Sequence, residues 1–365
     1  MRGDRIGVGF IGCGGIAHLH SSALREVARA GLPVVPVAAA DPVPAHREAV
    51  AANFAFERFY DTAEELLADP DVDAVWVGVP TAQHAAVYTA VLASGRHLYA
   101  EKPIAAELAT VRDLAALAAA TPLVAQVGFQ ARFDPLLDHA RALVTAGELG
   151  PVMSYLWRDD EAFPTASVGD TTSAWRSSRA SAGGGVLLEH SIHALDALAW
   201  IFGPVVRVTA SSRRVLGFDV EDTVVVLLEH ASGVIGAHVG VYGGVAGREL
   251  SRLEIHGRDA IVEIERNGVV LDADDNTFLL QRARCAPERL DRRGLVADHC
   301  ARHGIERPPF LLQDLADRAF VEAILQHRPA SPGFAEALAA HTVVAAAYRS
   351  AAEGGRPVAT AELAP

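Results

Sequence analysis

The sequence predicts an α/β protein in which a doubly wound parallel sheet is followed by an α+β domain with one long, mostly antiparallel sheet. In residues 1–125, short apolar runs alternate with helix-like stretches across short connections, as in parallel βαβ units. In residues 126–365, strand-like segments follow one another across polar turns, which favours antiparallel or mixed pairing. At 365 residues the chain is long enough for two domains that each bury a core.

The elements of residues 1–125 follow in a regular order. Apolar runs of about eight residues are typical of strands buried on both faces, and the stretches between them have helical composition. We therefore expect strand, helix, strand and helix in alternation. In chain order the segments are RIGVGFIG (5–12), AHLHSSALREVARA (17–30), VVPVAAAD (34–41), PAHREAVAANF (44–54), DAVWVGVP (73–80), QHAAVYTAVLASG (83–95) and HLYAEKP (97–103).

The elements of residues 126–365 indicate a different architecture. Several of the strand-like segments alternate polar and apolar residues, so one face of the sheet can pack on helices while the other meets water or a second subunit. This pattern favours self-association through that face. Strands are expected at 152–163, 205–215, 222–242, 252–259 and 260–272, and helices at about 135–147, 185–202, 310–327 and 334–353.

Charge and hydropathy exclude two classes of partner. The chain has 32 Lys+Arg against 45 Asp+Glu, a net charge of −13, and no cluster of basic residues that could follow a nucleic-acid backbone or an anionic membrane. No apolar run is long enough for a spanning helix, and the N-terminus leads directly into a strand pattern. We expect a cytoplasmic protein that binds neither nucleic acid nor membrane.

The three cysteines do not form a disulfide framework, because they are few and widely spaced. Cys285, His299, Cys300 and His303 could in principle bind zinc, but the stretch has no CxxC pair. A solvated loop and helix is the favoured interpretation, and we predict no metal site.

A glycine-rich turn after the first strand predicts a phosphate-binding loop. Gly12-Cys13-Gly14-Gly15-Ile16-Ala17 fits the G-x-G-x-x-G/A pattern and leads into a helix. Small residues let the backbone approach a pyrophosphate, and the helix N-terminus offers amide hydrogens to the anion. A glycine turn that holds no ligand is the alternative.

Asp41 predicts which dinucleotide binds. It ends the second strand, where a carboxylate can accept both adenosine ribose hydroxyls and repel a 2′-phosphate. This favours NAD over NADP. Arg47 lies near enough in sequence to serve a 2′-phosphate, so the choice stays open.

Seven segments in a fixed order carry a family resemblance. They are GFIGCGGIAHLH, VGVPTAQH, LYAEKPIA, VGFQARFDP, AWR, GGGVLLEHSIHALD and VEDTVVVLLEHASG. Over nearly its whole length the sequence resembles the Gfo/Idh/MocA family of nicotinamide-dependent oxidoreductases. The resemblance implies an N-terminal Rossmann domain, a C-terminal domain with a large open sheet that makes homodimer or homotetramer contacts, and redox chemistry at a hydroxyl or ketone of a sugar, cyclitol or related polyol.

The resemblance also implies roles for individual residues. Glu101 and Lys102 would lie beside the nicotinamide, with Pro103 fixing the turn through a cis bond. The remaining cofactor contacts would come from Gly12, Gly14, Gly15, Ile16, Asp41, Val79, Pro80, His84, Gln130, Trp175 and Arg176. Two positions depart from the family pattern: VGVPT replaces a VATPN-like segment, so that Val79 and Thr81 stand for Thr and Asn, and Glu189 stands where Asp is commonest.

The stretch LLEHSIHALD, residues 187–196, admits three interpretations. On one continuous helix, Glu189 and His193 are four residues apart and share a face. His190 and His193 could invite a metal, but the order is neither HExxH nor HxxEH. A structural helix with hydrogen-bonded histidines is the second alternative, and a proton relay is favoured over both. Asp196 could bind His193 or simply support packing.

Histidine suits this relay because its ordinary pKa lies near neutral pH. We assign His193 as the acid/base, Lys102 as the cation that polarises the substrate oxygen, and Glu189 as the group that orients one or both. Arg132, Tyr155, Asp159, Arg176 and His190 are predicted to bind substrate hydroxyls.

Three functions are consistent with these residues. The first is an NAD-dependent dehydrogenase or reductase of a small polyol or sugar. A glycoside hydrolase that uses NAD transiently and a non-catalytic sugar or dinucleotide sensor are the alternatives. Net NADH accumulation separates the first from the hydrolase, and the presence of Lys102 with His193 argues against the sensor.

Overall fold

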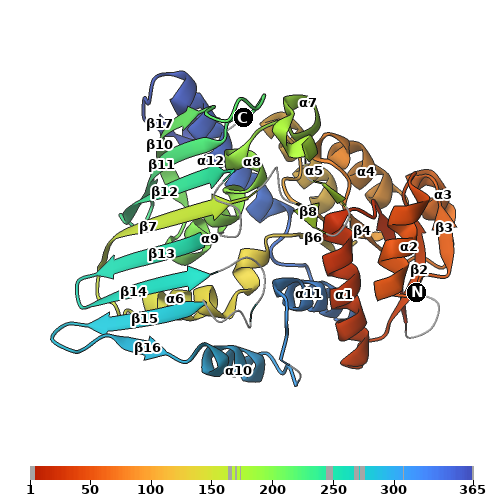
Figure 1. Cartoon of the computed structure of the whole chain (residues 1–365), viewed down its shortest axis with the longest axis horizontal. Helices are drawn as coiled ribbons and strands as arrows, with labels where there is room; N and C mark the ends of the chain where they lie inside the picture. Colours follow the sequence, from red (N-terminus) through yellow and green to blue (C-terminus); the bar gives the residue numbers. More distant parts are fainter. Residues whose placement is uncertain are drawn as a thin grey trace.

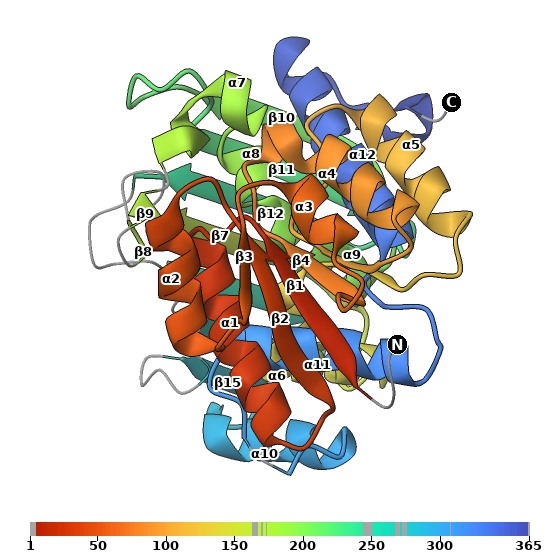
Figure 2. The ribbon, with the colours of Figure 1, turned by 90° about the vertical axis from the view of Figure 1, so that its right-hand side faces the viewer.

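Two sheets with helices packed on them make up the computed structural model of the chain (Figure 1). The structure describes residues 5–162, 167–168, 171–172, 174–243, 250–266, 271, 276–306 and 308–363. Figure 1 shows the parallel-sheet domain on the right and the larger sheet on the left, and Figure 2 shows the parallel-sheet domain in front of the other.

The N-terminal sheet is parallel, as the alternation of strands and helices predicts. Its six strands run in the order β3-β2-β1-β4-β5-β6, which is that of a Rossmann domain. The order reverses between β1 and β4, where open α/β sheets form their ligand crevice. The strands are β1 (Ile6–Ile11), β2 (Val34–Ala40), β3 (Arg58–Tyr60), β4 (Ala74–Val77), β5 (His97–Ala100) and β6 (Ala125–Val127), and the helices are α1 (Gly15–Arg29), α2 (Pro44–Asn53), α3 (Ala63–Ala68), α4 (Thr81–Ala93) and α5 (Leu108–Ala119).

The second sheet has nine strands in the order β16-β15-β14-β13-β7-β12-β11-β10-β17. β7 pairs in parallel with β12, and the other neighbours pair antiparallel, so the prediction of a large, mostly antiparallel sheet is confirmed. The strands are β7 (Val152–Glu161), β10 (Val205–Arg213), β11 (Thr223–His230), β12 (Ile235–Tyr242), β13 (Leu250–Gly257), β14 (Ala260–Arg266), β15 (Thr277–Arg282), β16 (Glu288–Leu290) and β17 (Val358–Ala359); β8 (Ser167–Val168) and β9 (Thr171–Thr172) form a separate pair.

Helices cover one face of the nine-stranded sheet. α12 packs on β10, and α9 packs against both α6 and α12. Side chains on this face of β11, among them Val224, Val226 and Leu228, are buried, while alternate residues face outward. The helices of this half are α6 (Pro135–Thr145), α7 (Arg179–Ala182), α8 (Val186–Glu189), α9 (Ile192–Phe202), α10 (Arg292–Arg302), α11 (Leu312–Leu325) and α12 (Phe334–Ala352).

The C-terminal part of the chain returns to the parallel-sheet domain. α11 lies beside α1 (Figure 1), and its Phe320 packs on Trp76 of β4 with ring centroids 5.0 Å apart. β6 ends at Val127, two residues beyond the predicted boundary at 125. The parallel-sheet core is therefore completed by residues that the division at 125/126 assigns to the other domain.

Several stretches differ from the sequence-based prediction, among them β3, α3 and β6, which were not predicted. The expected helix over 185–202 is two helices, because His190 leaves the helical conformation with φ −124° and ψ −57° between α8 and α9. β15, β16 and β17 had no strand prediction; β16 and β17 have only three and two residues. Phe163, 267–270 and Asp272, the ends of two predicted strands, lie outside the described residues.

None of the helices in the described part of the chain is both long and apolar enough to cross a membrane.

Candidate active site

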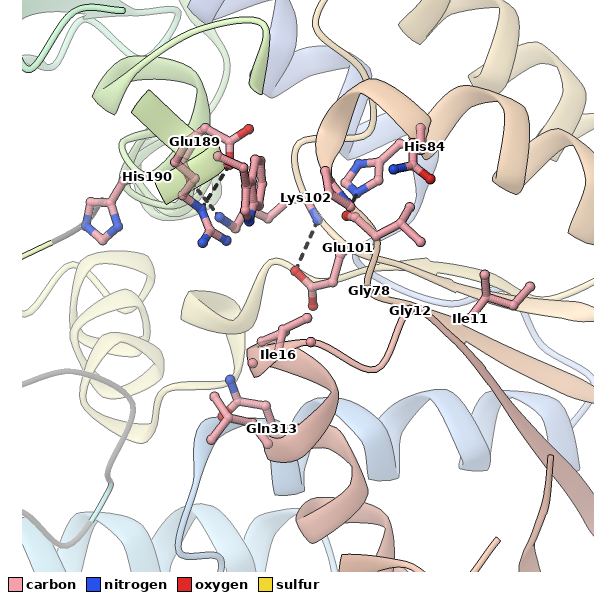
Figure 3. A pocket seen from close by; sticks show the side chains of 18 of the residues that line it. Ile11, Gly12, Ile16, Gly78, His84, Glu101, Lys102, Glu189, His190 and Gln313 are labelled. Atoms are coloured by element: carbon pink, nitrogen blue, oxygen red, sulfur yellow. Dashed lines mark hydrogen bonds and ion pairs between the residues drawn. The ribbon is translucent and has the colours of Figure 1, made fainter. Parts of the chain in front are cut away.

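A cavity of about 910 Å³ lies where the two domains meet, at the carboxyl ends of the parallel strands (Figure 3). Loops that follow β1, β4 and β5 form one wall. The junction of α8 and α9 and the end of β7 form the opposite wall. The cavity therefore begins at the switch point of the parallel sheet and extends toward residues of the second domain.

The glycine turn has the shape that a pyrophosphate requires. Gly12 has φ +83°, and a Cβ at this position would lie 2.8 Å from the Gly78 carbonyl carbon, so the turn excludes a side chain there. A Cβ on Gly14 would meet nothing within 4 Å, because this residue faces the cavity. Within the described part of the chain no side chain caps the start of α1, which leaves its first amides available to an anion. These features fit the pyrophosphate of NAD.

Asp41 lines the cavity just beyond the end of β2, and both of its carboxylate oxygens accept hydrogen bonds from main-chain amides. Its Oδ2 accepts a hydrogen bond from the Cys13 amide at 2.9 Å, and its Oδ1 accepts one from the Val43 amide at 2.8 Å. Arg47 instead donates to the Tyr60 carbonyl at 2.6 Å and to Asp61 at 2.5 Å. The arginine that could serve a 2′-phosphate is thus bound to neighbouring acceptors, whereas Asp41 lines the cavity.

The turn after β5 carries Lys102 into the middle of the cavity. The Lys102–Pro103 peptide bond is cis, as the resemblance implied. The turn is held by His84, whose Nδ1 lies 2.6 Å from the Pro103 carbonyl and whose Nε2 lies 2.9 Å from the Val79 carbonyl. Lys102 Nζ donates to the Glu189 main-chain carbonyl at 2.5 Å (Figure 3). Desolvation lowers the pKa of Lys102 below its usual value, and Arg176 lowers it further, against the opposing effect of Glu189.

His193 reaches the same cavity from the first turn of α9. Its ring stands edge-on to Phe129 with centroids 6.2 Å apart. Nδ1 is buried and has no hydrogen-bond partner among the described residues. Burial lowers the pKa of His193 well below 6.5, and the nearby charge of Lys102 lowers it further. His193 is therefore neutral at pH 7.

Glu189 does not contact His193, in contrast to the expectation of a shared helical face. Its Oε1 accepts a hydrogen bond from Thr81 Oγ1 at 2.6 Å, and its Oε2 lies 3.3 Å from Arg176 Nε. The reason is the break at His190, which separates α8 from α9 and turns the two side chains apart. Glu189 still lies beside Lys102, because its own carbonyl accepts the ammonium.

His190 joins two carboxylates at the end of β7. Its Nε2 lies 3.4 Å from Asp159 and its Nδ1 lies 3.1 Å from Glu161. Burial alone would lower the pKa of His190, but Glu161 and Asp159 together raise it above its usual value. His190 and its two carboxylates line the cavity next to His193, where they can bind polar groups of a ligand.

The structure brings most of the predicted site residues to this one cavity. All thirteen predicted cofactor residues are in its lining, and so are Glu189, His190, His193 and Asp159. Trp175 lies under Arg176, whose guanidinium is 4.4 Å from the ring centroid.

Two predicted substrate residues lie elsewhere, which corrects the sequence-based placement. Arg132 forms a two-pronged ion pair with Asp196, at 2.7 Å for both contacts, so neither residue reaches His193 or the cavity. Tyr155 is buried, stacks on Phe202 and has its hydroxyl 2.7 Å from His230 Nε2. Its side chain points to the helix-covered face of the sheet and not to the ligand.

A buried network behind Glu101 was missed. His20 lies 3.0 Å from Glu101 Oε1 and 2.8 Å from Asp317 Oδ1, and Trp76 Nε1 donates to the same aspartate oxygen at 3.1 Å. Against the effect of burial, Asp317 and Glu101 raise the pKa of His20 to about 10, so the ring is charged. No local pattern reveals this network, because His20 and Asp317 are 297 residues apart.

Asp138, His299 and His303 form a cluster of three potential metal ligands between α6 and α10. Cys285 is exposed and is not part of the cluster. Asp138 Oδ2 already accepts hydrogen bonds from Arg302 at 2.9 Å and His299 at 3.1 Å. This oxygen of Asp138 is therefore already engaged by two protein donors.

Two family models match the chain. The model described as "Oxidoreductase family, NAD-binding Rossmann fold" matches residues 6–129, and the "GFO/IDH/MocA C-terminal domain" matches residues 137–263. Inositol 2-dehydrogenase of Acidothermus cellulolyticus is 31% identical over 242 residues, covering 64% of this chain and 66% of the relative. The scyllo-inositol 2-dehydrogenase (NAD(+)) of Bacillus subtilis is 28% identical over 182 residues, covering 49% of this chain and 50% of the relative. The matches thus span half to two thirds of these relatives' lengths.

Solved structures share the fold along nearly the whole chain. Levoglucosan dehydrogenase in complex with NADH superposes with a TM-score of 0.83 at 20% identity, covering 98% of this chain and 99% of the other. An oxidoreductase domain protein from Kribbella flavida superposes with a TM-score of 0.84 at 24% identity, with the same coverage of both chains. The arrangement of the two domains in this chain is therefore also found in solved structures.

Proposed function

The chain belongs to the Gfo/Idh/MocA family of NAD-binding oxidoreductases, and we propose that it oxidises or reduces a carbinol carbon of a cyclic polyol, sugar or cyclitol. The observation that carries this proposal is the meeting of Lys102 and His193 in one cavity that starts at the glycine turn. The relatives named above are dehydrogenases, which supports this function over a hydrolase or a sensor.

Lys102 and His193 have separate roles in the proposed reaction: Lys102 stabilises negative charge, and His193 transfers a proton. NAD, when bound, supplies the nicotinamide that accepts or returns the hydride. Lys102 uses one of its three N–H groups on the Glu189 carbonyl, so two remain for a substrate oxygen. Its positive charge stabilises the alkoxide character of that oxygen.

His193 moves the hydroxyl proton. It is neutral before oxidation because its pKa lies well below 6.5. Since Nδ1 is enclosed by protein, Nε2 is the nitrogen that can accept the proton from the substrate hydroxyl. In the reverse direction the protonated ring returns that proton to the reduced oxygen.

The charged side chains that β7 and α8 contribute to the cavity lining favour an uncharged substrate. Asp159, Glu161 and Glu189 line the cavity, where His190 contacts Asp159 and Glu161 and Arg176 contacts Glu189. Such a surface offers both donors and acceptors to hydroxyl groups. We infer a neutral polyol, without a phosphate group.

The test is a spectrophotometric screen of inositols, sugars and sugar alcohols with NAD and NADP in parallel. Steady NADH accumulation with at least one neutral cyclic polyol is expected. If purified protein that binds NADH oxidises none of the polyols and reduces none of the matching ketones, the proposed function is wrong.

Asp41 is expected to set the cofactor preference. Replacing Asp41 with serine removes the carboxylate that would repel a 2′-phosphate and would accept the ribose hydroxyls. We expect kcat/KM with NAD to fall about tenfold to a hundredfold, and that with NADP to rise, from the loss of one charge-assisted interaction. Glu57→Ser, an exposed carboxylate outside the cavity lining, is the control and should leave both values unchanged. An unchanged ratio of NAD to NADP in Asp41→Ser would contradict this role.

We also propose that two copies associate through the open face of the large sheet. Leu227, Ala237 and Leu156 are directly paired across β11, β12 and β7, so they form one row on the face opposite the helices. Leu227 is 54% exposed and Leu156 is 41% exposed, which is costly for a monomer. A second copy of the chain would cover this row.

Replacing Leu227 with lysine is expected to convert a homodimer or homotetramer into smaller species, because the interface would then bury an unpaired charge at the β11 end of the row. Light scattering coupled to gel filtration measures the mass of each variant. Arg213→Lys, at the end of β10, serves as the control. A wild-type protein that is monomeric at all concentrations would contradict the proposed interface.

A further inference from the structure

A buried hydrogen bond connects the two domains next to the proposed catalytic lysine. Thr81 Oγ1, in the first turn of α4, donates to Glu189 Oε1 at 2.6 Å, across 108 residues of sequence. Thr81 is 3% exposed and Glu189 is 1% exposed. Glu189 belongs to the cavity lining, whereas Thr81 lies behind it.

Glu189 receives hydrogen-bond donors from three separate segments. The Thr81 hydroxyl and the Arg176 guanidinium approach its two carboxylate oxygens, and the Lys102 ammonium binds its main-chain carbonyl. A buried carboxylate needs such partners, because an unsatisfied charge in the protein interior is costly. Glu189 therefore connects two sets of contacts: its carboxylate binds Thr81 and Arg176, and its main-chain carbonyl holds the Lys102 ammonium.

The other end of α8 is fixed independently. The Glu221 carboxylate accepts hydrogen bonds from the amides of Gly185, at 3.0 Å, and Leu187, at 3.2 Å. A Cβ on Gly185 would lie 1.8 Å from the Glu221 carbonyl oxygen, so this close approach requires glycine. The start of α8 is thus held by the second domain, and the contacts of Glu189 decide where its end lies.

We propose that Thr81 is a positioning residue, whose hydroxyl holds Glu189 so that the Glu189 carbonyl keeps the Lys102 ammonium directed at the substrate oxygen. This inference rests on the proposed function. Loss of the hydroxyl would leave Glu189 Oε1 without this buried donor, and the carboxylate would then turn toward Arg176 or Lys102. The carbonyl that orients Lys102 would move with it.

The test compares Thr81→Val, which removes only the hydroxyl, with Thr81→Ser, which keeps it. We expect kcat of Thr81→Val to fall about tenfold to a hundredfold, as for a misplacement on the order of 1 Å. KM for the polyol and Kd for NADH should change less than about twofold, because Thr81 is not part of the cavity lining. Thr81→Ser should restore most of kcat. Thr342→Val, which removes a hydroxyl bound to the Leu338 carbonyl within α12, is the matched control and should retain wild-type kcat.

A double-mutant cycle with Glu189→Gln tests whether Thr81 acts through Glu189. We expect kcat of the double variant to lie within about threefold of kcat of the slower single variant, because both substitutions break the same arrangement. Wild-type kcat in Thr81→Val, or a fall of equal size in Thr81→Ser, would overturn the proposal, and so would fully additive losses.

The same cycle in urea gives a readout that does not need turnover. Thr81→Val and Glu189→Gln should each lower the urea concentration at the unfolding midpoint. In the double variant the two decreases are expected not to add, and additive decreases would overturn the coupling. If the wild-type protein turns over no polyol while the midpoints remain non-additive, the proposed function fails and the coupling of Thr81 to Glu189 stands.

Discussion

Replacing Lys102 with methionine is expected to lower kcat/KM for polyol oxidation by about a hundredfold to a thousandfold, the usual cost of removing one donor from a developing oxyanion. Methionine keeps the length of the side chain and removes its charge and its N–H groups. Because Lys102 donates to the Glu189 carbonyl and has two further N–H groups, the loss falls on the transition state. Steady-state kinetics measures the loss, and fluorescence titration with NADH should give a Kd close to that of the wild type.

Two further variants test whether the loss of activity is specific to the Lys102 ammonium. Lys102→Arg keeps a positive charge but replaces the ammonium with a planar group, so we expect only partial activity. Arg328→Met, an exposed cation remote from the cavity, is the control for a loss of charge and should behave as the wild type. A Lys102→Met protein with wild-type kcat/KM would show that the ammonium does not take part in the reaction.

Replacing His193 with glutamine is expected to lower kcat of oxidation by about a hundredfold to ten-thousandfold, the range typical of a lost general base. Glutamine has a similar size and can hydrogen-bond, but it accepts no proton near neutral pH. The same substitution should abolish the acidic limb of the pH profile of kcat/KM.

The sign of that pH dependence follows from two pKa shifts. Oxidation requires neutral His193 and charged Lys102. Burial lowers the pKa of His193 well below 6.5, so activity should fall only when the pH drops below 6.5. Desolvation lowers the pKa of Lys102 from 10.5, so activity should also fall at alkaline pH, before pH 10.5 is reached. His139→Gln, on α6 outside the cavity lining, should keep both limbs. An acidic limb that persists in His193→Gln would assign it to another group.

The sequence predicts those parts of the site that depend on local pattern. Gly12, Asp41 and the Glu101-Lys102-Pro103 turn each follow a buried parallel strand, and their position at the sheet edge results from that order alone. The large sheet was predicted from alternation in the same way, although β15 and the short strands β16 and β17 were missed.

The rest depends on contacts between distant segments. Glu189 does not contact His193 because of the break at His190. The break separates α8 from α9, which the sequence pattern predicts as one helix. Arg132 and Tyr155 have the chemistry of substrate ligands, yet each is satisfied by a buried partner, Asp196 or His230. The charge on His20 exists because α11 brings Asp317 back to the first domain.

The most direct test of the account is a crystal structure with NADH and a polyol identified by the screen. We expect one substrate oxygen to lie about 2.6–3.2 Å from both Lys102 Nζ and His193 Nε2, with the carbon that bears it beside the nicotinamide. A polyol oxygen that contacts only one of these two nitrogens, or a polyol bound away from both, would contradict the convergence on which the proposed reaction depends.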